Sequence, residues 1–115
     1  GYRNMVDLLI THGADINARD KDVLTPLHTA ALAGRKESVA LLIERGADVN
    51  ARNKKDLTPL HAAALVGDRE TVALLIDKGA DVNARSKDGL TPLRMASQQD
   101  HGEVVELLRT HRTQE

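Results

Sequence analysis

Residues 57–85 read LTPLHAAALVGDRETVALLIDKGADVNAR, and the rest of the chain repeats this stretch in whole or in part. The motif TPLH begins at Thr25 and again at Thr58, and TPLR begins at Thr91, with a constant step of 33 residues. A fixed period of this length is typical of an array of stacked structural repeats.

A second motif keeps the same step. GADIN begins at Gly13, and GADVN begins at Gly46 and at Gly79. Together with TPLH, the small-residue run HAAAL, the glycine after it and the segment VALLI, this motif resembles the ankyrin repeat. The resemblance covers almost the whole chain. It implies an all-α fold, a helix–turn–helix solenoid with β-turn fingers between successive units.

The composition suits one domain built in thin layers. A length of 115 residues allows one domain, and Tyr2 is its only aromatic residue. Leu, Ile, Val and Ala must therefore form the core, as in a stack whose units contact only their neighbours. We expect a single ankyrin-repeat domain over 1–115, made of a partial repeat (1–18), two repeats (19–51 and 52–84) and a C-terminal capping repeat (85–115).

Each unit is predicted to hold two helices. Thr25 is a good N-cap, and Pro26 suits the first helical position, where its missing N–H costs nothing. Gly34 ends this helix. A second helix is predicted over 37–45, and Gly46 follows it where a left-handed residue is favoured. The buried stripe of the second helix is predicted to be Val39, Leu42 and Ile43.

The resemblance implies an unusual backbone at one position in the finger, where the ankyrin family has Gly. Val23, Asp56 and Gly89 occupy it in successive units. A turn residue with φ > 0 is best as Gly, is acceptable as Asp and is poor as a β-branched Val. We therefore expect positive φ at this position, with a different or strained turn at Val23.

The two ends of the array differ. Met5 and Leu9 match the second helix of a unit whose first helix is absent, so we expect uncovered apolar surface there and a chain cut from a longer array. In the last unit Arg94 stands where the preceding unit has His61, and Arg109 replaces an isoleucine. Polar groups at the position of a further unit are what a terminal cap requires.

Several classes of function are disfavoured by composition. A formal net charge of −1 argues against a dedicated nucleic-acid partner. The absence of cysteine excludes a thiolate zinc site and a thiol nucleophile. No apolar run approaches the roughly 20 residues that span a bilayer, and no signal peptide is recognisable. We expect a cytoplasmic protein without membrane contact.

Histidines are the first candidates for catalysis or metal binding. His28 and His61 hold the same place in successive units, which sets them roughly 8–10 Å apart, too far to share one zinc ion. The resemblance implies instead that they form a hydrogen-bonded lattice with the threonine of TPLH. His12, His101 and His111 have no partner at ligand spacing, and we interpret them as solvated.

A ladder of acidic and amide side chains recurs in every unit. It could form a row of cation sites, but Asp and Asn also fix turns by bonding nearby backbone, and a unique site is not triplicated. No calcium loop, phosphate loop or nucleophile motif is present. We predict no enzyme, no cofactor and no metal. The ladder consists of Asp15, Asn17, Asp48, Asn50, Asp81 and Asn83.

The resemblance assigns partner binding to the concave face, formed by finger tips and inner helices. Leucines would make an apolar ladder there, rimmed by lysines and by Arg52 and Arg85, and rimmed apolar patches often mark interaction sites. Alternatively, the leucines pack between fingers and the lysines are ordinary solvated charge. The predicted partner-binding residues are Lys21, Leu24, Leu32, Lys54, Lys55, Leu57, Leu65, Val66, Lys87 and Leu90.

Our first hypothesis is a non-enzymatic protein–protein interaction module. A rigid concave surface would bind a protein or peptide with apolar anchors and acidic flanks, at little cost in ordering entropy. The alternative is a structural or engineered repeat scaffold without a ligand of its own. We expect a monomer, with weak self-association through the uncovered helix around Met5 and Leu9 as the variant of the scaffold hypothesis.

Overall fold

The computed structural model describes residues 25–112, and the elements found there are all helices. The predicted all-α class is confirmed. The partial repeat at 1–18 lies outside the described residues, as do Lys21, Val23 and Leu24 and the histidine at position 12. The helices are α2 (Pro26–Leu32), α3 (Lys36–Glu44), α4 (Pro59–Val66), α5 (Arg69–Asp77), α6 (Pro92–Gln98) and α7 (Gly102–Arg112).

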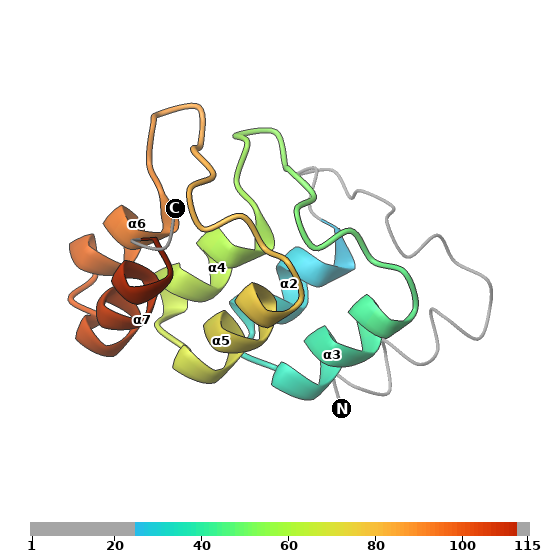
Figure 1. The fold of residues 1–115 in the computed structure, drawn as a ribbon. Coiled ribbons are helices and arrows are strands. Elements are labelled where there is room, and N and C mark those ends of the chain that lie inside the picture. Colours follow the sequence, from blue (N-terminus) through green and yellow to red (C-terminus); the bar gives the residue numbers. More distant parts are fainter. Residues whose placement is uncertain (1–24, 113–115) are drawn as a thin grey trace.

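The helices form two layers, as Figure 1 shows. The inner helices α2, α4 and α6 pack side by side, and the outer helices α3, α5 and α7 do the same. Each inner helix also packs against the outer helix that follows it in the chain. Two loops, 45–58 and 78–91, project from one side of the stack and are the predicted fingers (Figure 1). Each unit therefore contacts only its neighbours, which is the arrangement of a solenoid.

The inner helices begin where TPLH predicts. The hydroxyl of Thr25 accepts from the backbone N–H of His28 at 3.3 Å, and that of Thr58 accepts from the N–H of His61 at the same distance. Proline follows at the first helical position. The second helix of the first unit is displaced by one residue from the predicted 37–45, because Arg45 already leaves helical geometry. Gly46 then takes the predicted left-handed conformation, with φ 98°.

The core is aliphatic throughout. In the first two units Val39 and Leu42 of α3 and Val72 and Leu75 of α5 are buried against alanine-rich inner helices, as the sequence predicts. Ile43 is only partly buried and lies at the edge of this core. The small alanine side chains let the inner helices pack closely, so that thin layers suffice to exclude water.

The finger turns have the predicted backbone. Asp56 has φ 60° and Gly89 has φ 78°. In the first finger, the side-chain oxygen of Asn53 accepts from the N–H groups of Lys55 and Leu57, at 2.8 and 3.0 Å. The turn is thus held by its own polar groups, and its shape does not depend on the exposed side chains at its tip.

Candidate partner-binding face

The two TPLH histidines link each unit to the next finger. Nε2 of His28 lies 2.8 Å from the carbonyl oxygen of Leu57, and Nε2 of His61 lies 2.8 Å from that of Leu90. A carbonyl oxygen only accepts, so Nε2 carries the proton in both rings. Nδ1 of His61 then accepts from the N–H of Thr58, at 3.1 Å, and from its hydroxyl, at 2.9 Å. The predicted lattice is confirmed.

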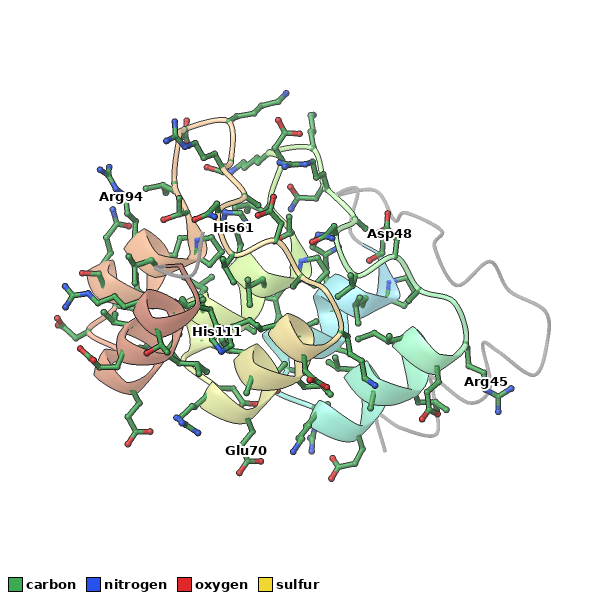
Figure 2. All side chains as sticks on the ribbon, in the orientation of Figure 1. Arg45, Asp48, His61, Glu70, Arg94 and His111 are labelled. Carbon is green, nitrogen blue, oxygen red and sulfur yellow. The ribbon has the colours of Figure 1, made fainter. Side chains whose placement is uncertain are left out.

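This lattice needs a neutral imidazole. His61 belongs to α4 and is fully buried, with its side chain toward the second finger (Figure 2). Burial lowers the pKa of His61 below its ordinary 6.5, and the positive charge of Arg52 lowers it further. The bond to the Leu90 carbonyl opposes this shift without reversing it. Nδ1 is also occupied as an acceptor, so His61 is a structural group with no lone pair left for chemistry.

The fingers are tied directly to one another. The N–H of Lys87 donates to the carbonyl of Lys55 at 2.9 Å. Nη1 of Arg52 donates to the carbonyl of Asp56 at 3.3 Å and to that of Arg85 at 3.1 Å. Arg52 was expected only to flank the finger, but its guanidinium bridges the two. Together these three hydrogen bonds hold the two fingers at a fixed spacing.

The predicted binding residues fall into three environments. The lysines of the finger tips, Lys54, Lys55 and Lys87, are exposed and form what we call the basic rim. The finger leucines, Leu57 and Leu90, are partly buried, and their carbonyls are the acceptors of the histidine lattice. The remaining described residues, Leu32, Leu65 and Val66, form what we call the apolar patch.

The apolar patch lies at the end of the inner helices. Leu32 is 38% exposed at the end of α2, and Leu65 and Val66 are 37% and 40% exposed in the last turn of α4. Among residues 25–112 these are the large apolar side chains left exposed. Because α2 packs on α4, the three belong to neighbouring elements. In the third unit the corresponding residues are Gln98 and Gln99, so the patch ends there.

His101 corrects one expectation. It was interpreted as solvated, but its Nε2 donates to the carbonyl of Leu65 at 3.0 Å, and its ring is only partly exposed. A Cβ built on Gly67 would overlap the imidazole, so the glycine makes room for it. His101 thereby joins the capping repeat to the end of α4. Repeat spacing could not reveal this contact, because Arg35 and Asp68 hold the same position in the earlier units.

The Asp and Asn ladder fixes turns, as interpreted. The side chain of Asp48 accepts from the N–H of Asn50 at 3.0 Å. Asn50 then spans the units, donating to the carbonyl of Gly79 at 3.1 Å and accepting from the N–H of Asp81 at 2.8 Å. Within the described chain, no three His, Cys, Asp or Glu side chains are grouped so that they could hold a metal ion.

No helix among residues 25–112 is long and apolar enough to cross a membrane. A family model described as ankyrin repeats (3 copies) matches residues 1–53 and 48–115. Ankyrin repeats are generally protein–protein interaction modules, and the family is typically non-enzymatic. The comparison with curated proteins gives no match.

Proposed function

The chain belongs to the ankyrin-repeat family, and from this premise we propose that it is a non-enzymatic interaction module that binds a protein or peptide on its concave face. The observation that carries the proposal is the combination of the apolar patch and the basic rim on elements that the lattice holds in place. The framework alone does not choose a partner, since the choice depends on surface residues.

The apolar patch supplies the anchor site. Leu32, Leu65 and Val66 keep more than a third of their surface exposed in a chain that buries its other large described aliphatics more fully. Contiguous exposed apolar side chains with polar surroundings favour a binding role. An apolar partner side chain that covers all three would remove this surface from water, and buried anchors of this kind dominate interface energies.

The basic rim sets the charge of the partner. Residues 52–56 and 85–88 carry five cationic and two acidic side chains, whereas the whole chain has a net charge of −1. The fingers are thus locally positive in a slightly acidic chain. A partner segment with acidic residues complements them, speeds encounter and fixes orientation. We therefore assign acidic flanks to the partner.

The apolar patch lies at the end of α4, whereas the basic rim lies on the fingers that precede α4 and α6, so at least the length of α4 separates the two sites (Figure 1). α4 begins directly after the first finger and ends at Val66, and its eight residues span about 12 Å. An extended peptide crosses that distance in about four residues. The fitting ligand therefore has an apolar anchor at least about four residues from an acidic cluster and runs along the inner helices.

Catalysis has no support in the described site. The TPLH histidines are both committed to hydrogen bonds with the next finger. His101 contacts the Leu65 carbonyl and has no acidic or nucleophilic partner among the bonds of its ring. We infer that the chain acts by binding, without a cofactor, and that it does so as a monomer, which light scattering across a concentration range would test.

Affinity capture with mass spectrometry, followed by titration of the captured partner, tests the proposal. The wild-type chain would be compared with Leu65→Asp and with a double variant, Lys54→Glu and Lys55→Glu. We expect each to weaken partner binding at least tenfold, and the salt dependence to fall only in the lysine variant. Lys36→Glu, an exposed charge reversal on the outer helix α3, is the matched control and should bind as the wild type does.

Thermal unfolding of each variant would show that the fold is retained, because all of the substituted side chains are exposed. Equal binding by the wild type and both site variants would overturn the assignment of the concave face. Capture of no specific partner would favour the alternative, a structural scaffold without its own ligand.

A further inference from the structure

Three side chains of one unit bind the backbone of the next. The donors lie in the finger and at the start of the inner helix, and their acceptors are three main-chain carbonyls along the following finger. The bonds run from Asn50 to Gly79 (3.1 Å), from Arg52 to Arg85 (3.1 Å) and from His61 to Leu90 (2.8 Å). Each donor therefore binds a main-chain carbonyl, and these bonds do not depend on the side chains of the segment that is bound.

The last unit presents the same three positions again, as Asn83, Arg85 and Arg94. Within residues 25–112 the side chains of these three make no hydrogen bond or ion pair. Arg85 and Arg94 are exposed, and Asn83 is partly exposed. In Figure 2 the Arg94 side chain projects from α6 away from the other helices. We call these three residues the terminal edge.

The exposed faces of the helices in the last unit are too polar for a further helical unit to pack on them. Ser97 and Arg109 stand where the preceding unit has Ala64 and Ile76, and both are exposed. Stacking another helix pair would bury the Arg109 guanidinium away from water, which is costly without a buried partner. The terminal edge therefore offers hydrogen-bond donors without a partner among the described residues, whereas the helices of the same unit present the polar side chains of Ser97 and Arg109.

We propose that the terminal edge binds an extended peptide segment of a partner protein through the main chain of that segment, with an acidic side chain facing Arg94. This surface includes none of the side chains of the apolar patch or the basic rim, although Arg85 also contributes to the positive charge of the fingers. Its occupant follows the path that residues 79–90 follow against the preceding unit, without the helices that flank it.

The amide of Asn83 sets the first contact. Asn50 uses both ends of its amide, donating to the carbonyl of Gly79 and accepting from the N–H of Asp81. Among the described residues, nothing bonds to either of these two groups in Asn83. Asn83 therefore fits a carbonyl and an N–H two residues apart on one peptide, and the Arg85 guanidinium fits a carbonyl further along, as Arg52 does within the array.

Arg94 adds charge at the second contact. Neutral His61 donates one proton to a carbonyl, whereas an arginine is always charged and its planar fork fits a carboxylate in a bidentate manner. Arginine also reaches further than imidazole. Its head group thus lies beyond the main-chain path, where an acidic side chain of the bound segment would be.

The probe for this edge is a peptide with the sequence of residues 79–90, acetylated and amidated at its ends, with its last residue changed as Leu90→Asp. It would be titrated into the 115-residue chain labelled with ¹⁵N. We expect saturable shifts of the Asn83 side-chain amide signals. Asn83→Ala should weaken binding about thirtyfold, as expected for the loss of two net hydrogen bonds. Arg94→Gln should remove the preference for this peptide over one with Leu90→Asn.

Asn50→Ala is the matched control, because it deletes the same amide one unit earlier. Asn50→Ala should lower the unfolding midpoint and leave the peptide affinity unchanged. Asn83→Ala should leave the unfolding midpoint unchanged and weaken peptide binding. Three results would overturn the proposal: no shift at Asn83 with millimolar peptide, an unchanged preference in Arg94→Gln, or self-association of the chain without peptide that Asn83→Ala abolishes. The last would assign the edge to a second copy.

Discussion

Replacing His61 with leucine tests the lattice that positions the candidate binding face. Leucine is apolar and comparable in size to histidine, so it fits the fully buried site. It removes the donor to the Leu90 carbonyl and the acceptor for the N–H of Thr58. The perturbation is therefore a loss of polar partners more than a loss of packing.

The magnitude follows from the groups left behind. A buried donor or acceptor that loses its partner costs about 1–3 kcal/mol. The Thr58 backbone is buried, whereas Leu90 is only partly buried and its carbonyl regains some contact with water. We expect His61→Leu to lower the free energy of unfolding by roughly 2–4 kcal/mol, a large share of the 5–15 kcal/mol typical of a domain.

The matched control is Arg94→Leu, which makes the same change one unit later. Arg94 is exposed and its side chain has no bond within the described chain, so this variant should stay within about 0.5 kcal/mol of the wild type. Urea unfolding followed by circular dichroism gives both values. A His61→Leu cost no larger than that of Arg94→Leu would refute the claim that the histidine bonds hold the units together.

Three further predictions concern single groups. Because its pKa is lowered in the fold, His61 stays neutral there while the unfolded chain takes up a proton near pH 6.5. The contribution of His61 to stability is therefore complete above pH 6.5. It decreases as the pH falls from 6.5 to the pKa of the folded state. His61→Leu should reduce that pH slope in urea titrations, and an unchanged slope would contradict the shift. Asp56→Gly should raise the free energy of unfolding by up to about 1 kcal/mol, because φ is 60° there; a lower free energy of unfolding would show that Asp56 is not strained. Gly67→Ala should destabilise more than Gly46→Ala, since only at Gly67 does a Cβ meet His101, and a His101→Ala background should reduce the cost of Gly67→Ala but not that of Gly46→Ala.

The fold was predictable because its determinants recur. Thr58, Pro59 and His61 act locally, through a cap, a fixed φ and a bond to the next finger, and each appears at the same step in the preceding unit. The left-handed turn residues Asp56 and Gly89 were found in the same way. A periodic pattern averages out the ambiguity that a single motif would carry.

Contacts that the repeat pattern does not mark were missed. His101 shares its position with an arginine and an aspartate, so no pattern marked its bond to Leu65. The bridging role of Arg52 was also missed, although the arginine itself repeats, because a charge next to a finger is usually solvated. The extent of exposure of Leu57 and Leu90 depends on the finger's path, which spacing does not give.

The same distinction explains why the repeat specifies the fold but leaves the partner open. The bonds between units use backbone carbonyls as acceptors, including those of Leu57 and Leu90, and the finger turn is closed by Asn53. The exposed side chains of Lys54 and Lys55 can therefore be substituted at little cost to the lattice. A surface whose shape is set by main-chain bonds can change its chemistry freely, because substitution there does not disturb the groups that hold it rigid. Lys54 and Leu57 recur in every unit, whereas the positions of Lys55, Leu65 and Val66 differ between units. We therefore expect the choice of partner to depend most on these three variable positions.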